Sequence, residues 1–298
     1  MGRMPYLAHD GSPLHYLQRG RGEAVLMIHG LGSTGADWSF QVAALERRFR
    51  LIIPDLPGSG HSLPPRGEYS IPGCAQSLWC LLDHLKVRRT SIIGYSLGGA
   101  VGLEMALHRP EQVRRLALIN SLAAYRVDHW RSWLELRGTA ALVRVLGMRR
   151  SAWLLAARMF PEPWQRALRR RAVAVIGAGC TQSILRMAQA LLRWTALDRL
   201  DRIRARALVI AGERDYLSMA EKRALAAKLR AAVVFVRGSR HGTPFDSVHA
   251  TNASLLALLS DRALPACGWL DCDQPIQLPE LILAGSIAEE HAMSLKSA

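Results

Sequence analysis

The sequence lacks several features that would indicate other classes of protein. It has no apolar run of about 18 residues or more, so no membrane-spanning helix is expected. Residues 1–11 have no apolar core of the kind found in a secretory signal peptide. The five cysteines are an odd number without metal-ligand spacing, although Cys267 and Cys272 are close enough to form a redox pair. These absences favour a reduced, cytoplasmic protein with no metal and no cofactor.

Acidic residues and lysines are scarce in one part of the chain. Residues 122–206 contain seventeen arginines, no lysine and five acids, so they carry +12 of the net charge of +15. Such a balance suits nucleic acid, an anionic membrane or an acidic substrate. No nucleic-acid-binding module is recognisable, and we expect no nucleic-acid partner.

One short stretch, Gly94-Tyr95-Ser96-Leu97-Gly98, organises the rest of the chain. A β-prone run, residues 90–93, leads into it, and a helical run, residues 97–108, follows it up to Pro110. The G-x-S-x-G spacing is typical of a sharp strand–turn–helix junction that holds a nucleophilic serine. Small residues at 94 and 98 let the strand and the helix approach each other closely. Ser96 is therefore the candidate nucleophile.

Buried strands alternate with helices on both sides of this stretch. Continuous apolar runs at 24–28, 51–53, 113–119, 207–210 and 233–236 predict strands, with shorter strands at 4–8 and 14–18. Helices are expected at 36–47, 71–85, 219–229 and 246–259, the last capped by Asp246. This alternation predicts an α/β fold with a mostly parallel central sheet and helices on both faces.

The alternation stops between residues 122 and 202, where the pattern is helical throughout. We therefore divide the chain into a first core part (1–121), an inserted helical lid (122–202), a second core part (203–262) and a C-terminal extension (263–298). The extension contains Pro265, Pro275 and Pro279 and shows little periodicity, so it is expected to be partly ordered at best.

Two further residues follow predicted strands at their carboxyl ends. Asp215 comes after the strand at 207–210, and His241 comes after the strand at 233–236. A serine needs a neighbouring base, and the base needs an acid that holds its tautomer. The chain order Ser96, Asp215, His241 is the order of such a triad in a parallel α/β sheet. Asp128 is the reserve candidate for the acid.

The loop His29-Gly30-Leu31-Gly32 follows the strand at 24–28 and should reach the same sheet edge. The backbone N–H groups of Leu31 and Leu97 are the expected oxyanion donors. His29, Gly30 and Tyr95 are candidate substrate-binding residues, and His29 is expected to brace its loop rather than to transfer protons. Asp55 and His61 are expected to hold a tight loop together.

Over residues 4–260 the chain resembles the α/β-hydrolase family, in its lidded single-domain form. The resemblance rests on five stretches that occur in the family's order: 29–32, 55–62, 94–99, 212–215 and 240–241. It implies a cofactor-free, esterase- or lipase-like serine hydrolase with Ser96, Asp215 and His241 as its triad. The sequence departs from the family at His241, whose preceding glycine lies three residues back, and in the extension after residue 263.

The resemblance implies a carboxylic ester, thioester or lactone of an acyl chain as substrate. A carbon–carbon bond hydrolase of the same fold, or a non-catalytic binding or sensing member, is the alternative. The lid contains five of the eight tryptophans among its arginines. It could cover the site with an apolar face, receive an anionic substrate, or contact an anionic membrane surface. The sequence does not indicate an oligomeric state.

Overall fold

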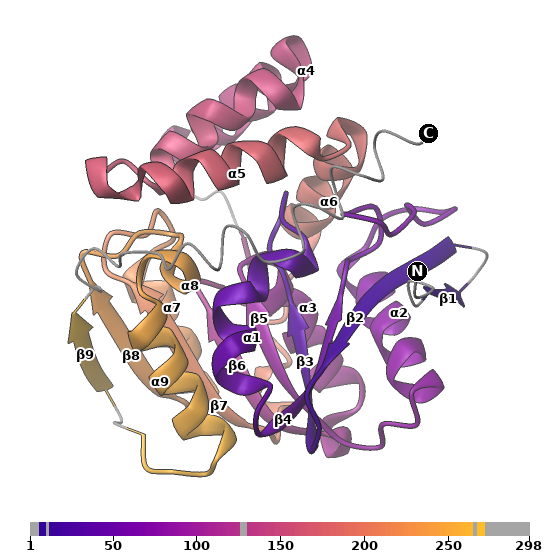
Figure 1. Ribbon diagram of the computed structural model, residues 1–298. Helices are drawn as coiled ribbons and strands as arrows, with labels where there is room; N and C mark the ends of the chain where they lie inside the picture. The colour runs from indigo at the N-terminus through magenta and orange to yellow at the C-terminus, as the bar shows by residue number, and fades with distance from the viewer. Residues whose placement is uncertain (1–5, 10–11, 126–129, 265–266, 272–298) are drawn as a thin grey trace.

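A mostly parallel sheet forms the centre of the molecule (Figure 1). The structure, a computed structural model, describes residues 6–9, 12–125, 130–264 and 267–271. The strands are β1 (Tyr6–His9), β2 (Ser12–Arg19), β3 (Glu23–Ile28), β4 (Phe49–Pro54), β5 (Thr90–Tyr95), β6 (Val113–Ile119), β7 (Arg206–Gly212), β8 (Ala232–Arg237) and β9 (Cys267–Asp271). Across the sheet they run in the order β1-β2-β4-β3-β5-β6-β7-β8-β9. Pairing is antiparallel at β1–β2 and β2–β4 and parallel from β4 onward.

Helices cover both faces of this sheet, as the sequence predicts. The core helices are α1 (Ser39–Leu45), α2 (Ile71–His84), α3 (Leu97–His108), α7 (Met219–Lys228), α8 (Thr243–Asp246) and α9 (Val248–Leu259). Side chains of α2, α3 and α7 share one apolar core with the sheet, while α1 and α9 share the other. Strands buried on both faces explain the continuous apolar runs of β3, β5 and β6. The expected fold class is confirmed.

The insertion between β6 and β7 is helical and lies beyond the carboxyl ends of the strands (Figure 1). It contains α4 (Trp130–Met159), α5 (Arg166–Ala178) and α6 (Thr181–Arg193). Gly147 interrupts α4 with a φ of 72°, so the helix bends there. A bridge between Ala124 and Thr195 joins the two ends of the insertion. Buried Glu104 of α3 accepts bonds from Trp194 Nε1 at 2.8 Å and from the Arg199 guanidinium at 3.1 Å.

Two details differ from the sequence prediction. The helix expected over 246–259 begins at Val248 as α9, because Ser247, with φ −139° and ψ 53°, is not helical and separates α9 from the short helix α8. Asp246 therefore ends α8 instead of capping a helix, and its carboxylate accepts bonds from Ser239 and Ser247. The second difference is β9, which extends the sheet beside β8 although no strand was expected after residue 260.

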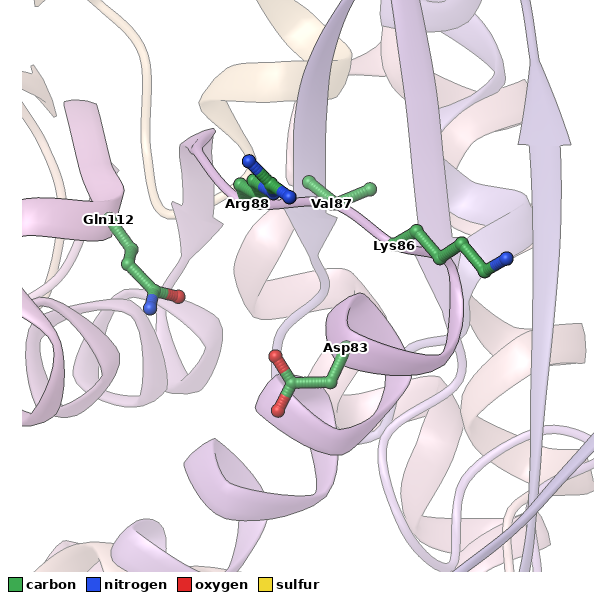
Figure 2. Close-up of a pocket in the computed structure, with 5 residues that line it drawn as sticks. All are labelled: Asp83, Lys86, Val87, Arg88 and Gln112. Atoms are coloured by element: carbon green, nitrogen blue, oxygen red, sulfur yellow. The ribbon is translucent and has the colours of Figure 1, made fainter.

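No helix among the described residues combines the length and hydropathy needed to cross a membrane. A recess of about 330 Å³ opens beside Val87 and Arg88, just before β5, and Asp83 and Gln112 also line it (Figure 2). It lies at the amino ends of the strands, opposite the end where Ser96 follows β5. Its lining contains no candidate catalytic residue.

Candidate active site

Ser96 occupies a strained turn between β5 and α3. Its backbone has a φ of 53° and a ψ of −117°, a conformation that a side-chain-bearing residue adopts only where the surroundings impose it. Its N–H donates to the Ile119 carbonyl at 2.9 Å. A Cβ at Gly98 would overlap the Ile28 carbonyl, and one at Gly94 would overlap the first turn of α3. Close backbone packing thus explains both glycines, and it presents the serine side chain at the sheet edge.

The structure brings the three triad candidates into one hydrogen-bonded series. His241 Nε2 lies 3.0 Å from Ser96 Oγ, and His241 Nδ1 lies 2.8 Å from Asp215 Oδ1. All three side chains are buried, with Asp215 showing no exposed surface. Each follows the carboxyl end of a strand, β5, β7 or β8, as expected from the sequence. This geometry allows a proton to pass from the hydroxyl to an imidazole that the carboxylate holds in place.

Asn120 was not identified from the sequence, although it too directly follows a buried strand, β6. Its side chain is fully buried, and its Nδ2 donates to the His241 carbonyl at 2.8 Å and to Thr243 Oγ1 at 2.7 Å. Its Oδ1 accepts the Gly212 N–H at 2.8 Å. The amide therefore fixes the histidine loop to the end of β7. The strand-end position was the signal that could have revealed it.

Lys222 was also not identified from the sequence, and the residues around it give no signal comparable to that of Asn120. It lies in α7 with no exposed side-chain surface, and its Nζ forms an ion pair with Asp215 Oδ2. Burial raises the pKa of Asp215, but the charges and hydrogen bonds of His241 and Lys222 outweigh burial and hold that pKa below its usual value. The carboxylate therefore stays ionised near neutral pH.

The loop after β3 approaches the nucleophile closely. A Cβ at Gly30 would contact the Tyr95 ring at 3.0 Å and Ser96 Cβ at 3.3 Å, so this position needs a residue without a side chain. Leu31 follows it, and Leu97 is the first residue of α3, whose first-turn N–H groups have no partner within the helix. The two proposed oxyanion donors thus lie on the segments that flank Ser96.

The other candidate substrate-binding residues are engaged within the protein. His29 Nδ1 lies 2.8 Å from the Gly30 carbonyl, and His29 Nε2 accepts the Leu56 N–H at 2.9 Å. Burial lowers the pKa of this imidazole, which favours its neutral form. The Tyr95 hydroxyl donates to the His241 carbonyl at 3.1 Å. These hydrogen bonds show that His29 and Tyr95 stabilise the loops around Ser96.

The lid covers the site with apolar side chains. Phe160, directly after α4, packs against Phe245, whose ring also meets Tyr95 edge-on with the ring centroids 5.7 Å apart. On the other side, Leu31 packs against a cluster formed by Val143, Met148 and Ile184. These contacts on the site side of the lid are apolar, and arginines 144, 149, 150 and 158 are exposed. Arg158 is close enough to Tyr216, which stacks on His241, to act on it electrostatically.

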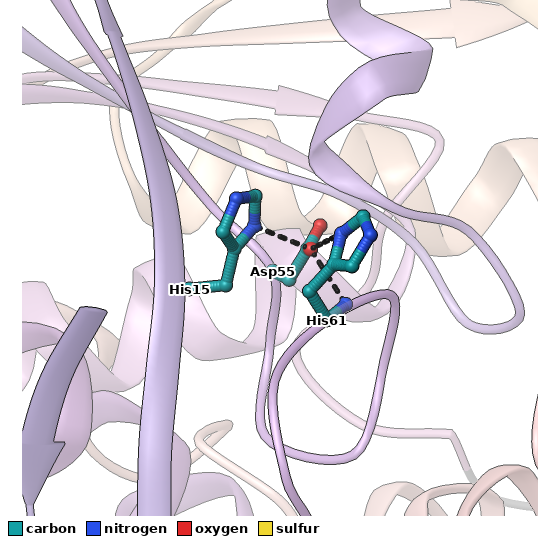
Figure 3. A group of neighbouring side chains, drawn as sticks. All are labelled: His15, Asp55 and His61. Atoms are coloured by element: carbon teal, nitrogen blue, oxygen red, sulfur yellow. Dashed lines mark hydrogen bonds and ion pairs between the residues drawn. The ribbon is translucent and has the colours of Figure 1, made fainter. Parts of the chain in front are cut away.

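His15, Asp55 and His61 form a polar cluster under the loop after β4 (Figure 3). Asp55 Oδ2 lies 2.8 Å from His15 Nδ1 and accepts the His61 N–H at 3.0 Å, while Oδ1 accepts the Gly35 N–H at 2.7 Å. Two imidazoles and a carboxylate this close together are a combination that also binds metal ions in proteins. Because both carboxylate oxygens already hold backbone N–H groups, the cluster is better explained as a brace for its loop.

Two candidate functional residues lie outside the described part of the chain. These are Asp128, the reserve acid, and Cys272, the possible redox partner of Cys267. Asp215 occupies the position of the acid beside His241, and Cys267 is a free, exposed thiol in the structure.

The sequence matches known proteins across its core. Residues 23–152 match the alpha/beta hydrolase fold family. The putative carbamate hydrolase RutD of Azorhizobium caulinodans is 31% identical over 223 residues, which cover 72% of this chain and 82% of that protein. An uncharacterized protein of Mycobacterium tuberculosis is 41% identical over 102 residues, or 34% of this chain and 30% of that protein. The chain thus spans about a third of the length of this last relative.

Solved structures match over most of the chain. A hydrolase from Pseudomonas aeruginosa PA01 matches with a TM-score of 0.78 and 29% identity. The match covers 87% of this chain and 98% of that one. The enol-lactonase from Burkholderia xenovorans LB400 has a TM-score of 0.77 and 26% identity, covering 86% of this chain and 100% of that one.

Proposed function

The chain belongs to the alpha/beta hydrolase fold family, and from that premise we propose that it is a serine hydrolase acting on a carboxylic ester, thioester or lactone with an acyl chain. The observation that carries this proposal is the buried series from Ser96 Oγ through His241 to Asp215, with contacts of 3.0 and 2.8 Å. A serine so placed is activated as a nucleophile.

In the first half of the reaction, Ser96 Oγ attacks the carbonyl carbon of the substrate while its proton passes to His241 Nε2. The carbonyl oxygen gains a negative charge, which the N–H groups of Leu31 and Leu97 stabilise. His241 then protonates the leaving alkoxide or thiolate as its bond to the carbonyl carbon breaks. An acyl group remains bonded to Ser96 Oγ.

In the second half, water takes the place of the leaving group. His241 removes a proton from this water, whose oxygen attacks the acyl carbon, and the same N–H groups stabilise the second oxyanion. The bond to Ser96 Oγ breaks as His241 returns the proton to the serine. Asp215 stays ionised throughout and holds His241 with Nε2 toward the serine.

The apolar side chains near the triad, several of them from the lid, favour a substrate whose acyl group is apolar. Phe160 and Phe245 lie beside Tyr95 on one side of the triad, and the Val143–Met148–Ile184 cluster lies beside Leu31 on the other. Apolar walls of this kind favour hydrocarbon over charged groups near the reacting carbonyl. The names of the relatives, a carbamate hydrolase and an enol-lactonase, also refer to carbonyl carbons bonded to a heteroatom.

Hydrolysis of p-nitrophenyl esters from short to long acyl chains, by wild type beside Ser96→Ala, tests this proposal. We expect activity that rises with chain length to an optimum and that the variant lowers by about 10³-fold or more. Ser59→Ala is a matched control because Ser59 is buried but lies in the loop after β4. Equal activity in wild type and Ser96→Ala would contradict the proposal. No activity on any ester would favour carbon–carbon cleavage or a binding role.

We further propose that the outer face of α4 contacts an anionic membrane surface. Residues 141–161 contain four arginines and no acid, and Val145, Trp153 and Leu154 are exposed by 80%, 58% and 42%. In Figure 1, α4 is the outermost element on the lid side of the molecule. Exposed tryptophan and leucine among arginines suit the boundary between anionic headgroups and acyl chains.

Flotation with vesicles tests this contact. Wild type should float with phosphatidylglycerol vesicles at low salt and stay behind with phosphatidylcholine vesicles, because the arginines need anionic headgroups. Replacing Trp153 and Leu154 by serine should weaken flotation about tenfold or more, whereas Leu63→Ser, an exposed leucine outside the lid, should not. Equal flotation of both variants would exclude α4 as the contact surface.

A further inference from the structure

Lys222 is a buried lysine to which the reaction described above assigns no step. It lies in α7, and both its side chain and that of Asp215 have no exposed surface. A buried ammonium group is costly unless it is paired, and lysine side chains are rarely enclosed completely. Its position directly beneath the triad therefore calls for an explanation.

The contacts of Lys222 tie it to the acid of the triad. Its Nζ forms an ion pair with Asp215 Oδ2 and donates to Asn120 Oδ1 at 3.4 Å. The opposite oxygen, Asp215 Oδ1, contacts His241 Nδ1 at 2.8 Å and accepts the Leu217 N–H at 3.2 Å. Each carboxylate oxygen thus has its own partners. The ammonium prevents the carboxylate from rotating away from the imidazole.

The positive charge of Lys222 also offsets the negative charge of Asp215, next to His241. An ionised Asp215 attracts positive charge strongly, because solvent barely reaches the pair that it forms with His241. The ammonium on Oδ2 offsets that attraction. Burial lowers the pKa of Lys222, while the negative charge of Asp215 opposes that effect and favours the ammonium form. The other titratable and charged groups near these side chains include Glu221, Tyr95, Tyr216, Tyr125, Asp246, Asp37 and Arg158.

We propose that Lys222 is a positioning residue that holds Asp215 Oδ2, keeps Oδ1 on His241, and offsets part of the carboxylate's negative charge beside the imidazole. Loss of the ammonium should therefore show in the pH dependence of kcat/KM. This inference rests on the proposed serine hydrolase reaction. Lys222 has no contact with the reacting atoms, so it acts through Asp215.

The pH dependence of ester hydrolysis separates this role from a structural one. In Lys222→Gln and Lys222→Met the acidic limb of the kcat/KM profile should move to higher pH by about one unit, because the opposing positive charge is gone. We expect kcat to fall about tenfold, far less than the ~10⁴-fold typical when the triad acid itself is neutralised. KM should stay within about twofold, since Lys222 lies away from the substrate.

Lys228→Met is the matched control. It removes the same charge from the same helix, but Lys228 is exposed and contacts the Leu197 carbonyl at 3.2 Å. Its profile should coincide with that of wild type. Circular dichroism should show all variants folded, because Asp215 keeps its donors from His241 and Leu217 when Lys222 is replaced.

An acidic limb that stays in place, or moves to lower pH, in Lys222→Gln would overturn the proposal. Loss of the fold in both Lys222 variants would also overturn it, because Lys222 would then be a requirement of the fold. A wild type inactive on every ester would count against the proposed reaction instead, so the two failures can be distinguished.

Discussion

At the scale of single residues, the proposed active site depends on backbone groups as much as on side chains. Leu31 and Leu97 contribute N–H groups to the proposed oxyanion site, and no ordinary substitution removes an N–H except proline. Leu31→Pro should therefore lower kcat about 10²–10³-fold, equivalent to about 3–4 kcal/mol of transition-state stabilisation. Leu31→Ala keeps the N–H and should retain most of the kcat. Comparable kcat values for the two variants, both folded, would exclude Leu31 as a donor.

A second residue-scale prediction concerns His61 and Asp55. Hydrogen bonding to Asp55 raises the pKa of His61 above its usual value, against the opposing effect of burial. A histidine whose pKa is raised by folding stabilises the protein fully below its unfolded pKa of about 6.5, and loses this effect as the pH rises through the folded pKa. Asp55 stays ionised over that range, because its hydrogen bonds with His15 and His61 outweigh burial and lower its pKa.

The free energy of unfolding, measured by urea denaturation across this range, tests the prediction. Wild type should exceed His61→Gln in stability at acidic pH, and the difference should shrink as the pH rises past the folded pKa of His61. His84→Gln is the control, since His84 is exposed at the end of α2. A constant difference between wild type and His61→Gln would show that the ionisation of His61 does not contribute.

These residues also show what the sequence can and cannot predict. Ser96, Asp215 and His241 could be chosen as candidates because each follows an apolar strand and has turn residues around it, and the structure brings them together. Lys222 escaped because a lysine in an amphipathic helix ordinarily faces solvent. Its burial depends on Asp215 lying under α7, a contact that appears only when the chain is folded. An ion pair that forms only when separate elements come together leaves no recognisable pattern in the sequence around either residue.

At the scale of secondary-structure elements, the lid is anchored to the nucleophile helix through Glu104. This buried carboxylate of α3 holds Trp194 and Arg199 at the carboxyl end of the insertion. Removing one partner of a largely buried pair is costly, so Glu104→Ala should lower the free energy of unfolding by about 2–3 kcal/mol. The loosened lid should also be cut faster by trypsin, since residues 122–206 contain seventeen arginines.

Limited proteolysis followed by mass spectrometry measures that effect directly. Glu111→Ala is the control, because Glu111 forms an exposed ion pair with Arg204 that should contribute little. Cleavage within the lid at the same rate in wild type and Glu104→Ala would show that Glu104 does not anchor it.

Elements were predicted best where one apolar pattern sufficed. The helix at 97–108 has the predicted bounds, and each buried strand appears where an apolar run predicted it. The short helix α8 was missed, and Asp246 ends it instead of capping α9. The Asp246 carboxylate accepts hydrogen bonds from Ser239 and Ser247 beneath the histidine loop, and such side-chain contacts leave no local pattern in the sequence. β9 was missed because its short segment pairs with β8 only in the folded sheet.

At the scale of the whole molecule, β9 is the last strand of the sheet and covers the edge of β8. Trp269 packs on Phe235 with ring centroids 5.0 Å apart, and Arg237 lies near Asp271 at 3.2 Å. Ending the chain at residue 264 would expose the β8 edge and the Phe235 ring. We expect a loss of about 2 kcal/mol, which for a domain of this size lowers the melting temperature by about 4–8 °C.

Ester hydrolysis at 25 °C should be retained in that shortened protein, because β9 contacts none of the triad residues. A chain ending at residue 271 keeps β9 and is the control for removing the remaining residues. Equal melting temperatures for the two shortened proteins would show that β9 does not stabilise the sheet.

We propose that Ser96 is a nucleophile activated by His241, which Asp215 holds in place. Fluorophosphonate labelling followed by peptide mass mapping tests this proposal without a known substrate, because the reagent bonds to activated serines. We expect one added phosphonyl group on the peptide that contains Ser96, no labelling in Ser96→Ala, and much slower labelling in His241→Gln. Folded wild type that takes up no label, or a label on a serine other than Ser96, would contradict it.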